Sequence, residues 1–185
     1  MVNDAQELEI STWHEAAASY ESGHTFLRWL LGYEIAFAQV GERLSDCFVR
    51  SRQDVLRFDA LELANLKYDF DCLLCACSGY AAESIAGACD ESEWLSSKDR
   101  QRGFEVAKRL SRGDAQAAEL LVHWARRMAT VILSANKAKV QRLADALLTH
   151  RRLSGKEIND LLVNNGHNDD AGRFTIRNRM SASRC

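Results

Sequence analysis

Residues 20–32 read Tyr-Glu-Ser-Gly-His-Thr-Phe-Leu-Arg-Trp-Leu-Leu-Gly, and this stretch decides the fold of the 185-residue chain. It forms the second half of a helix predicted over residues 12–31. Thr12 can cap this helix, and Glu15 follows three residues later, as in a capping box. Gly32 ends the helix, since glycine readily adopts the backbone conformation of a helix C-terminus.

The segment from Tyr20 to His24 differs at one position from a zinc peptidase helix, which reads H-E-x-x-H. Residues four apart on a helix are separated by about 40° and about 6 Å, so two side chains can bind one metal ion. The glutamate between them activates the metal-bound water as general base. Here Glu21 and His24 are in place, whereas Tyr20 occupies the first ligand position. This fragment alone is best explained as a surface pair.

Four segments in the same order resemble the FtsH-type zinc peptidase domain. Residues 20–32 resemble its zinc helix, which carries H-E-A-G-H, an apolar stretch and a glycine. Residues 78–87, Ser-Gly-Tyr-Ala-Ala-Glu-Ser-Ile-Ala-Gly, resemble its A-G-R-A-A-E-E segment. Residues 96–101, Ser-Ser-Lys-Asp-Arg-Gln, resemble its S-x-x-D-L-x-x-A helix start, and residues 153–158, Leu-Ser-Gly-Lys-Glu-Ile, its closing L-x-G-x-E-I element. The likeness spans residues 12–163.

The resemblance implies a role for each matched residue. His24 and Asp99 are expected to be zinc ligands, and Glu21 is expected to be the general base. Tyr20 departs from the pattern, because a neutral phenol with a pKa near 10 is a poor zinc ligand beside imidazole. Three alternatives remain open: zinc binds weakly, another residue supplies a ligand, or the chain is a pseudo-peptidase that binds none.

Other side chains could replace the missing ligand. His14 lies about 15 Å from His24 along one continuous helix, too far to share a metal ion. Cys89 precedes the Asp99 helix and is a candidate substitute. The sequence Cys72-x-x-Cys75-x-Cys77 lies in an apolar, helix-like stretch without a second such pair, so core packing is favoured over a metal site.

Hydrophobic periodicity predicts a mainly α fold with one or two short β-strands near residues 35–50. Further helices are expected over residues 61–85, 97–111, 115–150 and 155–163, with Asp114 and Ser154 as caps. Residues 1–11 are expected to be a flexible N-terminus and residues 12–163 one domain. Residues 164–185 are polar and are expected to be a disordered tail.

Composition narrows the class of protein. The formal net charge is −2 and the pI about 6.2, which argues against a nucleic-acid-binding protein. The absence of an apolar run of about 18 residues predicts no membrane span, and the polar start does not resemble a signal peptide. We therefore expect a cytoplasmic protein in which the six cysteines are reduced.

The resemblance implies a zinc metallopeptidase that cleaves peptide bonds in flexible or unfolded proteins. The chain contains no G-x-x-x-x-G-K-[ST] phosphate loop, so the ATPase module of full-length family members is not part of it. The alternative is a catalytically inactive pseudo-peptidase that serves as a protein-interaction or assembly module. Assembly into a homo-oligomer is expected by analogy with the hexameric rings of the family. A third interpretation is a helical interaction protein whose likeness to the family is accidental.

Overall fold

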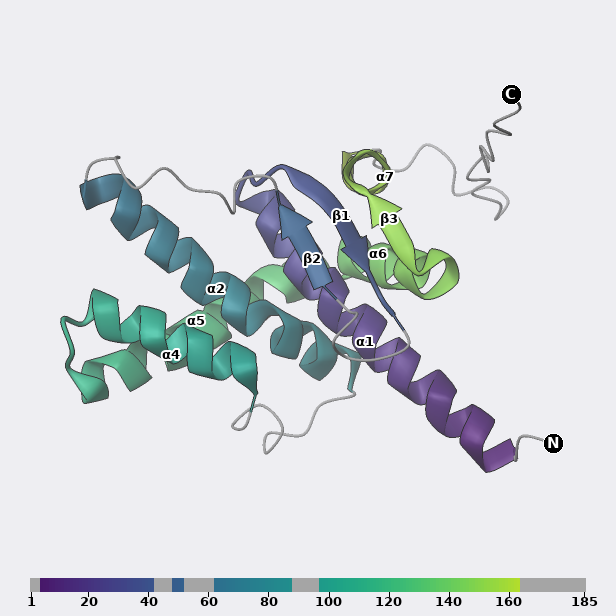
Figure 1. The fold of residues 1–185 in the computed structure, drawn as a ribbon, viewed down its shortest axis with the longest axis horizontal. Coiled ribbons are helices and arrows are strands. Elements are labelled where there is room, and N and C mark those ends of the chain that lie inside the picture. The colour runs from purple at the N-terminus through teal and green to yellow at the C-terminus, as the bar shows by residue number, and fades with distance from the viewer. Residues whose placement is uncertain (1–3, 42–47, 52–61, 88–96, 164–185) are drawn as a thin grey trace, which may run out of the picture.

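The computed structural model describes residues 4–41, 48–51, 62–87 and 97–163. The helices in these ranges are α1 (Asp4–Leu30), α2 (Glu62–Ala86), α4 (Lys98–Leu110), α5 (Ala115–Ala135), α6 (Lys137–His150) and α7 (Gly155–Val163). The strands are β1 (Ile35–Gln39), β2 (Phe48–Ser51) and β3 (Arg152–Ser154). The predicted mainly α fold with short strands is therefore confirmed (Figure 1).

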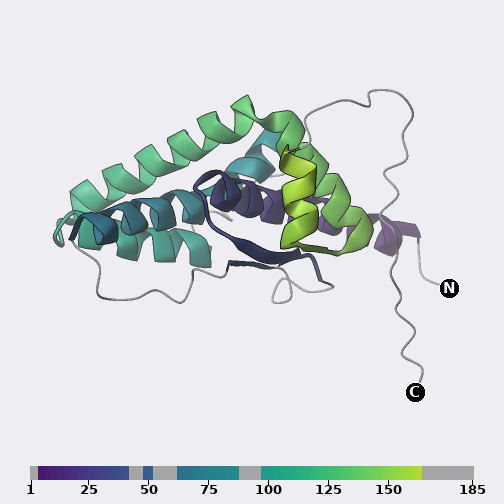
Figure 2. The ribbon, with the colours of Figure 1, turned by 90° about the horizontal axis from the view of Figure 1, so that it is seen from above.

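Helix α1 runs through the middle of the molecule and contacts most other elements. It packs against α2 and α6, and it also contacts β1, β2 and α5. Figure 2 shows α1 between the strands on one side and α5 on the other. Helix α2 packs in turn against α4 and α5. The two helices that carry the candidate site residues, α1 and α4, are therefore held together by their shared neighbour α2.

Small side chains allow the helices to approach closely. On α5 the alanines that face the core, Ala118, Ala125 and Ala129, have no exposed surface, and Leu133 completes the same buried stripe. On α1 the aromatic ring of Phe26 is fully buried. Burial of apolar surface of this kind contributes about 25 cal/mol per Å² to stability.

The strands form one three-stranded antiparallel sheet in the order β2-β1-β3. Strands β1 and β2 lie within the range predicted for strands. Strand β3 was not expected, and its Leu153 pairs with Ala38 of the central strand β1. Gly155 follows directly, and a Cβ atom there would lie only 1.8 Å from the carbonyl oxygen of Ile35. A glycine at this position therefore allows the start of α7 to lie against β1.

Three predicted helix starts are confirmed by their capping contacts. Ser97 accepts a hydrogen bond from the backbone nitrogen of Arg100 at 3.0 Å, and Asp114 accepts one from Ala117 at 2.9 Å. The backbone nitrogen of Ser154 donates to Oε2 of Glu157 at 2.7 Å, which completes the predicted capping box of α7.

Two predicted boundaries were wrong. The helix expected over residues 115–150 is two helices, because Asn136 leaves the helical conformation with φ −119° and ψ 24°. Its side-chain amide donates to the carbonyl oxygen of Ile132 at 2.9 Å, so it competes with the helical backbone pattern. Helix α1 begins at Asp4 rather than at Thr12, so the proposed capping box of Thr12 and Glu15 lies inside the helix. The expected tail, residues 164–185, lies outside the described residues.

None of the helices in the described ranges is long and apolar enough to cross a lipid bilayer.

Candidate functional site

The structure brings His24 of α1 next to Asp99 of α4. Nε2 of His24 lies 3.4 Å from Oδ2 of Asp99, and the two side chains are 12% and 20% exposed. The cap at Ser97 starts α4 so that Asp99 falls in its first turn. Burial opposes ionisation of Asp99, but the hydrogen bond and charge of His24 outweigh it, with help from Tyr20 and Arg102, and lower its pKa to about 2. Asp99 is therefore a carboxylate at neutral pH.

Tyr20 belongs to the same cluster. Its hydroxyl donates a hydrogen bond to Oδ2 of Asp99, the oxygen that also faces His24. Its ring meets the imidazole of His24 edge to face, with centroids 4.7 Å apart and planes at 75°. Burial, followed by the charge of Asp99 and the hydrogen bond to it, raises the pKa of Tyr20 well above its usual value. The phenol is therefore neutral, and its hydroxyl group donates its proton in a hydrogen bond to the carboxylate.

Ser78 of α2 contacts the other nitrogen of the imidazole ring. Its Oγ lies 3.0 Å from Nδ1 of His24 and donates a hydrogen bond to the carbonyl oxygen of Cys75 at 2.7 Å. Because that proton is used, Ser78 is placed to accept a hydrogen bond from Nδ1, while Oδ2 of Asp99 faces Nε2. The contacts from Ser78 to His24 and from His24 to Asp99 resemble a hydrolytic triad. However, Ser78 has no exposed surface and cannot attack a substrate.

Glu21, the residue expected to be the general base, is only 4% exposed. Burial raises its pKa to about 7, while the charges of His24 and Arg28 act in the opposite direction. It therefore lies near the cluster but is enclosed by the protein. A carboxyl group of this kind exchanges its proton near neutral pH, without being presented to a substrate in solution.

Close packing of α1 against α2 depends on two glycines. A Cβ atom on Gly79 would lie 2.6 Å from Nε2 of His24 and from ring atoms of Tyr20. A Cβ atom on Gly23 would lie 2.4 Å from the carbonyl oxygen of Ser78. Gly79 thus leaves room for the two aromatic rings. Neither the role of Gly23 nor that of Ser78 was foreseen, because a sequence pattern does not give the distance between two helices.

The cluster does not fit a zinc ion. A structural or catalytic zinc site takes at least three protein ligands, and the charged or imidazole donors here are two, His24 and Asp99. The third position holds the neutral phenol of Tyr20, which already donates to Asp99. Among the residues that the structure describes, no group of three or more His, Cys, Asp or Glu side chains is placed to hold a metal ion.

Among the described residues, none of the other candidate ligands forms a metal-binding group with His24 and Asp99. His14 contacts Trp13 ring to ring, further along α1. Cys77 is fully buried, and burial raises the pKa of its thiol to about 12, as expected for a cysteine in the core. Cys75 is also buried, whereas Cys72 is partly exposed, and all three thiols are free. Cys89 lies outside the described residues, so its candidacy as a substitute ligand stays a prediction.

Comparison with known proteins assigns the chain neither a family nor a function. No model of a known protein family matches the chain. No curated protein sequence matches it significantly.

Proposed function

We propose that this chain is a non-catalytic relative of the FtsH-type zinc peptidase domain that serves as a protein-interaction or assembly module. The observation that carries the proposal is the hydrogen bond from Tyr20 to Asp99. In a working site of this type, Asp99 would direct its lone pairs at a metal ion. Here the carboxylate accepts a hydrogen bond from the phenol of Tyr20 and faces His24 instead.

Two further features support a non-catalytic role. The side chain expected to act as general base, Glu21, is buried beside the cluster and only 4% exposed. The cluster also joins α1, α2 and α4 through Tyr20, Ser78 and Asp99, so it contributes to the stability of the fold without a metal ion. A structural role of this kind would explain why a non-catalytic relative keeps His24 and Asp99 at the positions of the zinc ligands.

A zinc-dependent peptidase is the second candidate. One observation favours it: His24 and Asp99 lie side by side, and Glu21 is close enough to both to respond to their charges. Such an enzyme would require a ligand from a part of the chain outside the described residues, such as Cys89. It would act on flexible peptides, since the chain has no ATPase motif to unfold a substrate.

Metal analysis separates the two candidates. We expect the full chain, purified without added zinc, to contain far less than one zinc ion per chain and to leave casein intact. We also expect excess zinc to produce no cleavage that depends on Glu21. About one zinc per chain, lost in His24→Ala and accompanied by casein cleavage that Glu21→Gln abolishes, would overturn the non-catalytic proposal.

A further inference from the structure

A groove begins at the cluster and runs along α4. Its volume is about 290 Å³, and its walls come from one face each of α1, α2 and α4. Four of its lining side chains are small or apolar, and they are called the floor of the groove: Cys72, Cys75, Ala76 and Val106.

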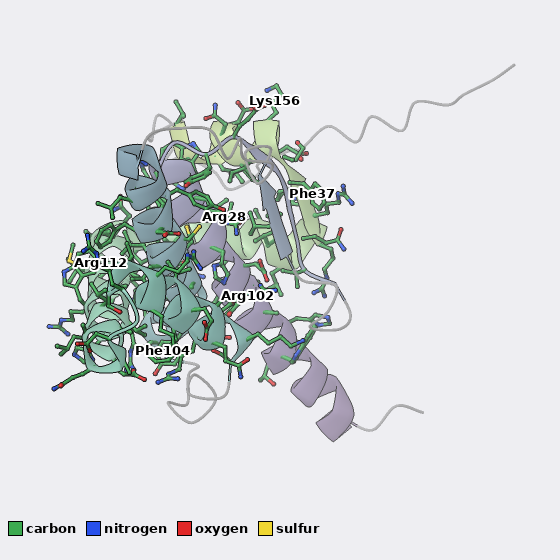
Figure 3. The ribbon with its side chains drawn as sticks, turned by 60° about the vertical axis from the view of Figure 1, so that its left-hand side comes forward. Arg28, Phe37, Arg102, Phe104, Arg112 and Lys156 are labelled. Atoms are coloured by element: carbon green, nitrogen blue, oxygen red, sulfur yellow. The ribbon has the colours of Figure 1, made fainter. Side chains whose placement is uncertain are left out.

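Three arginines line this groove, against two aspartates. Arg28 comes from α1, and Arg102 and Arg109 come from α4. Figure 3 shows Arg28 and Arg102 on the same side of the molecule, where α1, α2 and α4 meet. The side chains of Arg102 and Arg109 are 77% and 57% exposed, so both guanidinium groups reach the solvent at the rim.

The two aspartates of the groove are already engaged. Asp71 accepts hydrogen bonds from Lys67 at 2.5 Å and from Tyr33 at 3.1 Å. Asp99 accepts from Tyr20 and faces His24. Both carboxylates are engaged by neighbouring side chains, and Asp99 also forms an ion pair with Arg102, so the groove retains three arginines against two engaged aspartates.

The arginines on α4 retain donors for a ligand. Arg102 lies 3.6 Å from Oδ1 of Asp99, which is beyond hydrogen-bond distance. Arg109 uses Nη2 to bind Asp69 at 2.6 Å. A guanidinium group has five N–H donors in a planar fork that suits carboxylates, so each arginine can bind a second carboxylate.

We propose that this groove binds a short acidic peptide segment of a partner protein, with its carboxylates on Arg102 and Arg109 and its apolar side chains on the floor. The inference rests on the proposed function, since it assigns a partner class to the interaction module. The two arginines are seven residues apart on α4, which is about 10 Å along the helix. In an extended peptide, side chains two residues apart lie on the same face and about 7 Å apart, a separation that the long arginine and glutamate side chains can bridge.

Fluorescence anisotropy of a labelled hexapeptide, Glu-Leu-Glu-Glu-Leu-Glu, tests the proposal on the full chain. The comparison peptide is Gln-Leu-Gln-Gln-Leu-Gln, which has the same shape without charge. We expect binding of the acidic peptide only. Arg102→Gln and Arg109→Gln should each weaken binding about fivefold, the effect of one partly exposed ion pair. Arg142→Gln, which removes an exposed arginine on α6 away from the groove, is the matched control and should leave affinity unchanged.

Each other outcome overturns the proposal. Equal binding of the uncharged peptide would show that carboxylates are not recognised. An equal loss in Arg142→Gln would indicate attraction to the overall charge of the protein. Competition by free glutarate at the affinity of the peptide would assign the groove to a small dicarboxylate. Failure of both peptides to bind, with no zinc and no cleavage in the metal analysis, would overturn this inference and leave the non-catalytic proposal standing.

Discussion

The hydroxyl of Tyr20 donates a hydrogen bond to Oδ2 of Asp99, the same oxygen that lies 3.4 Å from Nε2 of His24. One carboxylate oxygen therefore joins two side chains of α1 to the first turn of α4. In a zinc site, a metal ion would make this connection. Here a phenol makes it, so the junction between the two helices is expected to depend on a protein hydrogen bond.

Tyr20→Phe removes this hydrogen bond and keeps the ring. We expect the variant to lose about 2 kcal/mol of unfolding free energy, because a partly buried hydrogen bond to a charged group is lost. Urea unfolding followed by circular dichroism measures the change. Tyr33→Phe is the control, and it should lose less, since Asp71 keeps its contact with Lys67. A Tyr20→Phe variant as stable as the wild type would show that the hydrogen bond does not hold the junction.

Chelation should leave the wild-type protein unchanged. Because the cluster is closed by Tyr20, no bound metal is expected to contribute to folding. The thermal midpoint should therefore be the same with and without EDTA, after purification in the absence of added metal. A midpoint that falls on chelation and returns with zinc would contradict this expectation, since ligands that bind only the native state stabilise it.

Tyr20→His would give α1 the spacing of a zinc peptidase helix. Two imidazoles four residues apart, with Asp99 beside them, provide three donors of the usual type. We expect this variant to bind about one zinc per chain, as measured by metal analysis after dialysis. Tyr20→Phe is the matched control and should bind none. Failure of Tyr20→His to bind zinc would show that residues beyond position 20 prevent metal binding.

The buried carboxyl group of Glu21 should make stability depend on pH. Its pKa in the folded protein is about 7, against 4.5 for the exposed group, so the native state favours the protonated form. Stability from this group is complete below about pH 4.5 and is lost as the pH rises through 7. Relative to wild type, Glu21→Gln should therefore become more stable by about 3 kcal/mol between pH 4.5 and pH 8.

Urea unfolding at several pH values checks this expectation. Glu105→Gln, at an exposed position on α4, is the control and should show a nearly constant difference from the wild type. A constant difference for Glu21→Gln as well would mean that the carboxyl group is not desolvated in solution. The comparison uses differences between variants, so other groups that titrate in this range cancel.

Local patterns in the sequence predicted three helix starts, at Ser97, Asp114 and Ser154, because capping needs only residues near in the chain. The start of α1 was predicted at Thr12 instead of Asp4. The contact between His24 and Asp99 joins residues far apart in the chain, and only the family resemblance suggested it. Neither source could give the bond from Tyr20 to Asp99, which depends on how closely α1, α2 and α4 pack. Strand β3 was missed because three residues are too few for a periodic signal.

Gly79→Ala tests that close packing directly. The new methyl group would lie 2.6 Å from the rings of Tyr20 and His24, so the helices must separate or the cluster must distort. We expect a loss of about 1–3 kcal/mol in unfolding free energy, as for other overpacked cores.

Gly103→Ala on α4 is the matched control, because its methyl group would meet Ala76 at 3.4 Å, an ordinary contact. Alanine also favours a helix by about 1 kcal/mol over glycine, so this control should be neutral or stabilised. Equal stability of the two variants would mean that α1 and α2 lie further apart at Gly79 than the structure places them.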